Sequence, residues 1–85
     1  MKYKVKAHFT VNNRSFEIDT RTHSLNRISV QDAMIIDLYY RYYSDYYGKG
    51  IFEKIQAELR DEFHIAVSTE AIRAVTKNCY KEEMS

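Results

Sequence analysis

Two segments near the N-terminus, residues 2–11 and 14–22, alternate apolar and polar side chains one by one. Strict alternation is typical of a β-strand with one buried face, because successive side chains of a strand point to opposite faces. Asn12 and Asn13 separate the two segments, and asparagine tolerates the positive φ angles of a two-residue hairpin turn better than most residues do. The sequence therefore predicts an antiparallel β-hairpin over residues 1–22.

One strand register satisfies both faces of this hairpin. On the apolar face it pairs Val5 with Thr20, Ala7 with Ile18, and Phe9 with Phe16. On the polar face it pairs Lys6 with Asp19, and His8 with Glu17. A slip of one residue would move the whole apolar set into solvent. Because an isolated hairpin is marginal in water, we expect its apolar face to cover the helix that follows.

Length and composition indicate one small globular domain. The chain has 85 residues, of which 45% are hydrophobic and 29% charged, and it contains no proline and two glycines, which argues against disorder and long loops. We expect a single α+β domain over residues 1–85. In it the hairpin precedes three α-helices: a tyrosine-rich helix over residues 29–47 and a helical pair over residues 51–80.

The tyrosine-rich helix is apolar over most of its circumference. Ser29 is its expected N-cap, Gly48 ends it, and six tyrosines lie between Tyr39 and Tyr47. Its narrow polar stripe consists of Asp37, Arg41, Ser44 and Asp45. A helix of this kind is buried or has partners on two sides.

Three interpretations of the tyrosines remain open. Most of the rings can pack between the hairpin and the helical pair. Alternatively, the stripe of Tyr40, Tyr43 and Tyr47 forms a homodimer or partner surface, since tyrosine is enriched in interface cores. The third interpretation is stacking on exposed nucleobases, which needs neighbouring cations, and only Arg41 and Lys49 are close in the sequence.

Residues 55–75 have the outline of two helices joined by a short connection. Ser68 is the expected N-cap of the second helix, and Val67 and Ile72 occupy the positions of a hydrophobic staple. The apolar face of the first helix contains Phe52, Ile55 and Leu59, and the corner between the helices is filled by Phe63, Ile65 and Val67. Four carboxylates are expected to form the solvated face of the first helix: Glu53, Glu58, Asp61 and Glu62.

This segment resembles the helix-turn-helix of transposases and small phage or plasmid regulators. The resemblance is carried by Ile55, Leu59, Ile65, Val67-Ser68, Ile72 and Val75. It implies that exposed positions of the second helix meet DNA: Thr69, Glu70, Arg73 and Thr76 near the bases, and Lys77 towards phosphates. Arg73 would read guanine and Thr69 would bind phosphate. Ala66 stands where these families often have a turn glycine, so the turn must be built differently.

The charge distribution gives this resemblance limited support. Residues 1–28 carry six basic and two acidic side chains, a local charge of +4, whereas residues 64–85 are neutral. Most DNA-binding modules have a clear cationic footprint, and the second helix of the pair lacks one. We expect basic residues of the polar face of the hairpin to add phosphate contacts, in particular Lys2, Lys4, Lys6 and Arg21.

No catalytic or metal-binding constellation is evident. The three histidines and Cys79 lack the spacing of a zinc site, and Gly48-Lys49-Gly50 lacks the rest of a phosphate-binding loop. We therefore expect no enzyme activity, no metal and no cofactor. No apolar run of about 18 residues is present, so no membrane partner is expected. A lone cysteine favours the reducing cytoplasm.

Two functions from different classes follow from these features. The first is a small helix-turn-helix regulator of phage or mobile-element type that binds duplex DNA, with a homodimer doubling its few cationic contacts. The second is a small phage-type inhibitor that resembles anti-CRISPR or other host-takeover proteins and binds a host protein through the tyrosine-rich surface. The orientation of Tyr40, Tyr43 and Tyr47 should discriminate between them.

Overall fold

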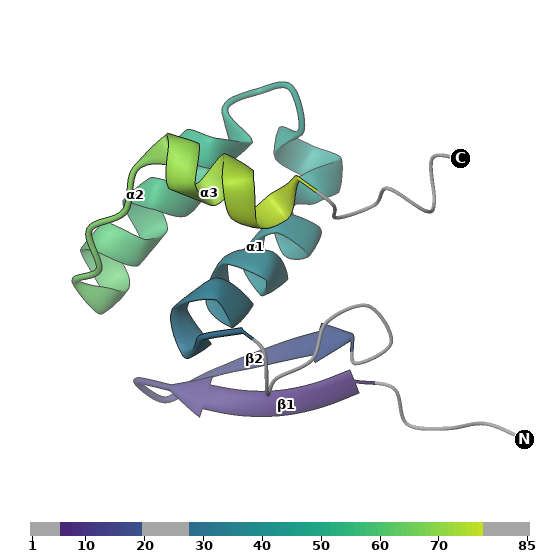
Figure 1. Ribbon diagram of the computed structural model, residues 1–85, viewed down its shortest axis with the longest axis vertical. Helices are drawn as coiled ribbons and strands as arrows, with labels where there is room; N and C mark the ends of the chain where they lie inside the picture. The colour runs from purple at the N-terminus through teal and green to yellow at the C-terminus, as the bar shows by residue number, and fades with distance from the viewer. Residues whose placement is uncertain (1–5, 20–27, 78–85) are drawn as a thin grey trace, which may run out of the picture.

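A computed structural model describes residues 6–19 and 28–77 of the chain (Figure 1). An antiparallel two-stranded hairpin precedes three helices, which confirms the predicted α+β class. The elements are β1 (Lys6–Val11), β2 (Arg14–Asp19), α1 (Val30–Tyr46), α2 (Ile51–Phe63) and α3 (Thr69–Thr76).

The hairpin has the predicted register. Phe9 lies opposite Phe16, and His8 lies opposite Glu17. Asn12 and Asn13 form the turn with φ angles of 51° and 65°, as a type I′ hairpin turn requires. The predicted pair of Val5 and Thr20 lies outside the described residues.

Helix α1 is the centre of the fold. Its first turn is capped as predicted, because the Ser29 hydroxyl accepts a hydrogen bond from the Asp32 amide at 3.1 Å. The helix packs against β2, α2 and α3, so its broad apolar circumference has a partner on several sides (Figure 1). The core comprises Phe16, Ile18, Ala33, Met34, Ile35, Ile36, Leu38, Tyr39, Ile51, Ile55, Leu59, Phe63 and Ile72.

A buried carboxylate attaches the hairpin to α1. The Asp37 side chain is 3% exposed and accepts a hydrogen bond of 2.6 Å from the Glu17 amide of β2. The Arg41 guanidinium, one turn further along α1, binds the other Asp37 oxygen at 2.9 Å. Asp37 belongs to the predicted polar stripe of α1, and its carboxylate is buried because β2 covers this end of the helix.

Two glycines make the break between α1 and α2. Tyr47 is the C-cap of α1, and Gly48 follows it with a φ of 75°, in the left-handed region that side chains with a Cβ rarely adopt. Gly50, with a φ of 85°, then stands at the N-cap of α2, where no side chain caps the helix. The first amides of α2 are thus left for solvent or a ligand.

The connection between α2 and α3 runs over residues 64–68. His64 takes the left-handed position with a φ of 58°, so the turn needs no glycine at Ala66. Gln56 donates a hydrogen bond of 2.9 Å to the Val67 carbonyl and ties the connection to α2. Ser68 caps α3 as predicted, accepting from the Ala71 amide at 3.1 Å.

Candidate nucleic-acid interface

Three cationic side chains of the described residues have no carboxylate partner among those residues. Within residues 6–19 and 28–77, the charged groups of Arg14, Arg41, Lys54 and Arg60 each lie within 4 Å of a carboxylate. Lys49, Arg73 and Lys77 are exposed, and no carboxylate of the described residues pairs with them. A cation without a carboxylate partner in its own chain is available to an anionic partner such as a phosphate.

Arg73 of α3 is held over an aromatic ring of α2. Its guanidinium carbon lies 4.6 Å from the centroid of the Phe52 ring. Phe52 is the second residue of α2 and follows the Gly48–Gly50 break, so Arg73 stands beside the uncapped start of that helix. Lys49 lies in the same break. The fold therefore brings together two cations that are far apart in the sequence.

The same Phe52 ring joins Arg73 to the tyrosines of α1. Phe52 lies parallel to Tyr39, with ring centroids 6.2 Å apart, and Tyr39 contacts Tyr43 edge to face at 5.5 Å. Tyr43 then stacks on Tyr47 at 4.5 Å. A continuous chain of ring contacts thus leads from the exposed face of α3 to the C-terminal end of α1. We call the set of Tyr43, Tyr47, Lys49, Phe52 and Arg73 the aromatic-cationic surface.

The stripe of Tyr40, Tyr43 and Tyr47 is only partly exposed. Tyr47 is 53% exposed, whereas Tyr40 and Tyr43 are half-buried and each contacts the buried Tyr39 ring. The first interpretation of the tyrosines, packing within the domain, therefore holds for Tyr39. Tyr47 is available to a partner.

Helix α3 exposes some of the predicted DNA-contacting residues and buries one. Thr69 is half-buried, and Glu70, Arg73 and Lys77 are exposed. Thr76 is 2% exposed, and its hydroxyl donates a hydrogen bond of 2.9 Å to the Ile72 carbonyl. The prediction that Thr76 meets DNA was wrong, because position 76 lies one turn after Ile72 on the face that packs against the rest of the domain.

Of the four predicted hairpin cations, Lys6 is the one within the described residues. Lys4 and Arg21 lie outside the described residues, and Lys6 is the first residue of β1. The apolar face of the hairpin packs on α1, so its polar face, marked by the exposed His8, points away from the helices. Since α3 packs against α1 and α2, the polar face of the hairpin and the exposed face of α3 are separate surfaces.

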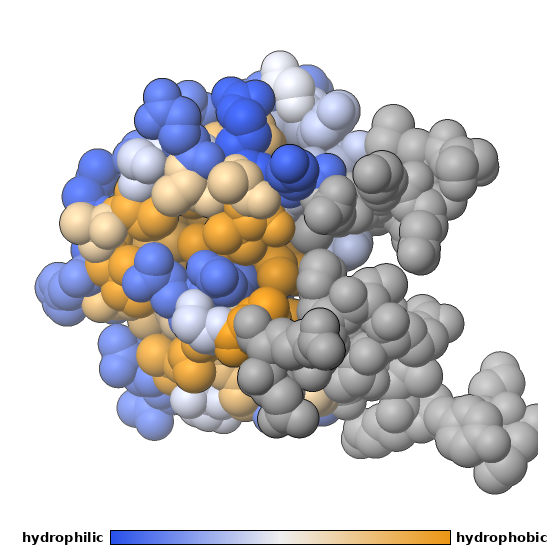
Figure 2. Space-filling model, in the orientation of Figure 1, coloured by the Kyte–Doolittle hydropathy of each residue, from blue (hydrophilic) through white to orange (hydrophobic). Residues whose placement is uncertain are grey.

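Hydrophilic side chains lie along one edge of the face in Figure 2, over α3 and the connection between α1 and α2. Apolar surface is gathered below that edge, between α3 and the hairpin.

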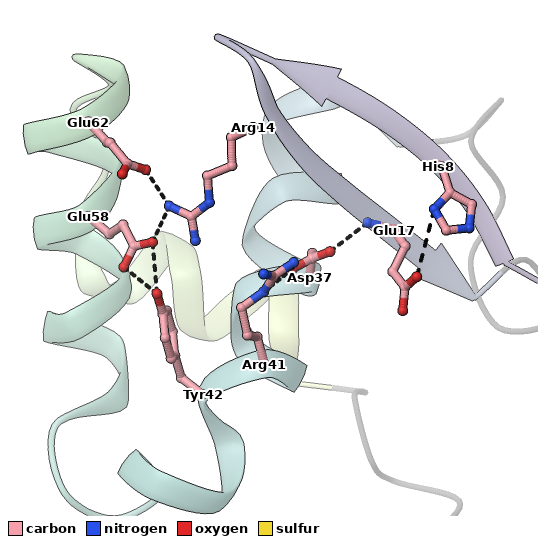
Figure 3. A network of polar contacts seen from close by, with 8 residues as sticks. All are labelled: His8, Arg14, Glu17, Asp37, Arg41, Tyr42, Glu58 and Glu62. Carbon is pink, nitrogen blue, oxygen red and sulfur yellow. Dashed lines mark hydrogen bonds and ion pairs between the residues drawn. The ribbon is translucent and has the colours of Figure 1, made fainter.

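A polar cluster lies on the flank of α2 opposite to the aromatic-cationic surface. Arg14, at the start of β2, reaches across to Glu58 and Glu62 of α2 (Figure 3). The Tyr42 hydroxyl of α1 donates to both Glu58 oxygens, at 2.6 and 2.8 Å. The Glu58 side chain is only 11% exposed, so the prediction that it belongs to a solvated face was wrong. No sequence pattern indicated this cluster, because its members belong to three different elements.

This cluster changes the protonation behaviour of its members. Burial raises the pKa of Glu58, but hydrogen bonds from Tyr42 and Arg14 and the charges of Arg14 and Lys54 outweigh it, so the pKa lies below its ordinary value. Burial and the hydrogen bond to Glu58 raise the pKa of Tyr42. Burial lowers the pKa of the Arg14 guanidinium, but its hydrogen bonds outweigh this effect. The pKa of Arg14 therefore lies above its ordinary value, and the guanidinium stays charged.

The Arg14–Glu58 cluster is satisfied from within the chain. It lines an open hollow of about 530 Å³ together with Tyr42, Lys54, Ala57, Asp61 and Glu62. The charged groups of this cluster already have partners of the opposite sign. The cluster therefore acts as a structural connection between the hairpin and α2. Among the described residues no group of three or more histidine, cysteine and carboxylate side chains is placed to hold a metal ion.

Comparisons with protein-family models, with curated proteins and with solved structures find no match for this chain. Within the described part of the chain, no helix is both long and apolar enough to cross a membrane.

Proposed function

We propose that the protein is a small helix-turn-helix DNA-binding protein that contacts duplex DNA through α3 and the start of α2. The observation that carries the proposal is the position of Lys49, Arg73 and Lys77. These placed cations have no carboxylate partner in the described chain, and all three lie on α3 or at the start of α2.

The proposed contacts follow from the exposed face of α3. Arg73, with its planar guanidinium, has the geometry for bidentate contact with guanine in the major groove. Thr69 and Lys77 lie on the same helix, one near its start and one just after its end, and suit phosphate contacts. Lys49 and the uncapped amides of α2 would hold a further phosphate, since the start of a helix favours negative charge.

Two exposed carboxylates lower the expected affinity. Glu53 lies in the first turn of α2 and Glu70 in the first turn of α3, and both would repel the DNA backbone. Few phosphate contacts per protomer fit a homodimer, in which two copies of α3 engage two half-sites. A cytoplasmic regulator of phage or mobile-element type remains the proposed biological setting.

We expect salt-sensitive binding of a random duplex that depends on the cations of α3. Changing both Arg73 and Lys77 to glutamine should weaken binding and lower the slope of log K against log salt by about one, since Lys77 supplies a phosphate contact, worth about 0.9, and Arg73 contacts a base. Changing Glu70→Gln should tighten binding, because it removes a repulsive charge. Fluorescence anisotropy with a labelled duplex, from about 50 to 200 mM salt, measures both effects.

Arg60→Gln is the matched control for the cation variants. Arg60 is exposed on α2, its guanidinium pairs with Asp61, and it lies outside the proposed interface. The control should retain the wild-type affinity and slope. The proposal is wrong if the wild-type protein does not bind duplex DNA at low salt, or if Arg60→Gln weakens binding as much as the α3 variant does.

A protein partner is the second candidate function, favoured by the composition of the aromatic-cationic surface. Tyrosine and arginine are the residues that dominate binding energy at protein interfaces, and Tyr47 is exposed. An inhibitor of this type would bind its target through Tyr40, Tyr43 and Tyr47 without salt-sensitive DNA binding. Light scattering of the isolated chain, followed by capture of partners with wild-type protein and a Tyr47→Ala variant, tests it.

A further inference from the structure

The Tyr47 ring is exposed and is held in position by stacking on Tyr43; we call it the aromatic platform. Of the phenylalanine and tyrosine side chains in residues 6–19 and 28–77, it alone is exposed, at 53%. Its ring lies nearly parallel to that of Tyr43, at an interplanar angle of 23° and a centroid distance of 4.5 Å. An exposed ring that is stacked on a second ring has less freedom to lose on binding than a free one.

The support of this platform reaches into the core. Tyr43 contacts Tyr39 edge to face, at 72°, and Tyr39 is 6% exposed. The backbone of Tyr47 is also held, because its amide donates a hydrogen bond of 3.0 Å to the Tyr43 carbonyl. The ring of Tyr47 is therefore positioned by contacts that the folded domain makes in any case.

The tyrosines on the other flank of α1 have internal roles. The Tyr42 hydroxyl binds Glu58, and the Tyr46 ring meets the Tyr42 ring edge to face at 5.7 Å. The Lys54 ammonium lies over both of these rings. This flank is thus occupied by the chain itself, whereas the Tyr47 ring is 53% exposed and contacts only Tyr43 among the ring contacts of the described residues.

Two cations belong to the same surface as Tyr47. Lys49 follows Tyr47 by two residues, and Arg73 covers Phe52, which is linked to Tyr47 through the ring contacts of Tyr39 and Tyr43. The sequence alone places only Arg41 and Lys49 near the tyrosines, but Arg41 pairs with Asp37 and α3 supplies Arg73 instead. Stacked rings beside cations are the arrangement that binds unpaired bases and their phosphates.

We propose that Tyr47 stacks on an unpaired nucleobase while Lys49 and α3 hold the neighbouring phosphates. The protein then prefers DNA in which a duplex meets a single strand. This inference rests on the proposed DNA-binding function and names the form of DNA that it recognises.

The test compares three labelled DNA probes by fluorescence anisotropy at low salt. They are a blunt duplex, the same duplex with a single-stranded thymidine tail, and the same duplex with an abasic tail of equal length. The two tails carry the same phosphates, so their difference isolates base stacking. The wild-type protein should bind the thymidine tail about ten-fold more tightly than the abasic tail, the effect expected of one stacked base.

Three variants locate the effect. Tyr47→Leu should abolish the preference for the thymidine tail, whereas Tyr47→Phe should keep it, since the ring and not the hydroxyl stacks. Tyr46→Leu makes the same change on the occupied flank and should also keep it. Equal affinity of the wild-type protein for the two tails, with blunt-duplex binding intact, overturns this inference alone and leaves Tyr47 open to a protein partner.

The proposed function fails in a different way. If the blunt duplex is not bound at low salt but the thymidine tail is bound and depends on Tyr47, the duplex-binding proposal is wrong and the stacking inference stands for single strands. If no probe is bound, both are wrong.

Discussion

Changing Ile72 to alanine is expected to destabilise the protein by about 2–5 kcal/mol, because it removes a buried aliphatic side chain and leaves a cavity. Ile72 is fully buried and belongs to α3, a helix of 8 residues. A helix this short is not stable in water by itself and depends on tertiary packing. Urea denaturation measured by circular dichroism should therefore show a lower midpoint, with α3 the first element to lose protection from hydrogen exchange.

Ala74→Ser is the matched control for Ile72→Ala. Ala74 is exposed on the same helix, so its substitution should change the free energy of unfolding by no more than about 0.5 kcal/mol. Equal effects of the two variants would show that α3 is not held by Ile72, and the orientation of its exposed face would then be wrong as well.

Changing Glu58 to alanine is the second large expected effect. The variant leaves the Arg14 guanidinium, 23% exposed, without its most buried partner, and leaves the Tyr42 hydroxyl without an acceptor. Loss of one member of a buried ion pair costs about 3–5 kcal/mol, and partial exposure of this pair reduces the expectation to about 2 kcal/mol. The hairpin should become the least protected element in hydrogen exchange.

The same carboxylate makes stability depend on pH. The pKa of Glu58 in the folded protein lies below its value in the unfolded chain, so Glu58 contributes stability above the ordinary glutamate pKa of about 4.3. That contribution is lost as the pH falls through the folded value. The wild-type protein should therefore lose more stability on acidification than Glu58→Ala does. Glu53→Gln, an exposed change on the same helix, is the control that should leave this difference intact.

Local patterns predicted the elements of this fold because each pattern acts over a few residues. Alternation and the Asn12-Asn13 turn were sufficient for the hairpin register. Serine caps marked the starts of α1 and α3, and Gly48 marked the end of α1. Each of these signals concerns the hydrogen bonding or the conformation of a single turn, which the local sequence determines.

Contacts between elements could not be predicted in the same way. Arg14 and Glu58 are 44 positions apart in the sequence, and Glu58 was expected on a solvated helix face. Asp37 is buried only because β2 lies over it. Thr76 sits in a short helix whose buried face depends on how α3 lies on α1, and the sequence did not specify that angle.

The candidate site was predicted in two parts that the structure joins. Arg73 and Lys77 were predicted as DNA contacts of the helical pair. Tyr43 and Tyr47 were predicted as part of the tyrosine stripe. Phe52 was assigned only to the apolar face of its helix, but it is the residue that connects the two parts. The one signal in the sequence was the position of this aromatic residue just after the Gly48–Gly50 break.

The central claim is that DNA binds to α3 and the start of α2. Amide chemical shifts of ¹⁵N-labelled protein, followed during titration with a short random duplex at low salt, test this claim most directly. We predict that the shifts change most at residues 69–77 and 49–53 and return to their free values as salt is added. Unchanged shifts, or changes centred on Arg14 and Glu62 on the opposite flank of α2, would contradict the claim.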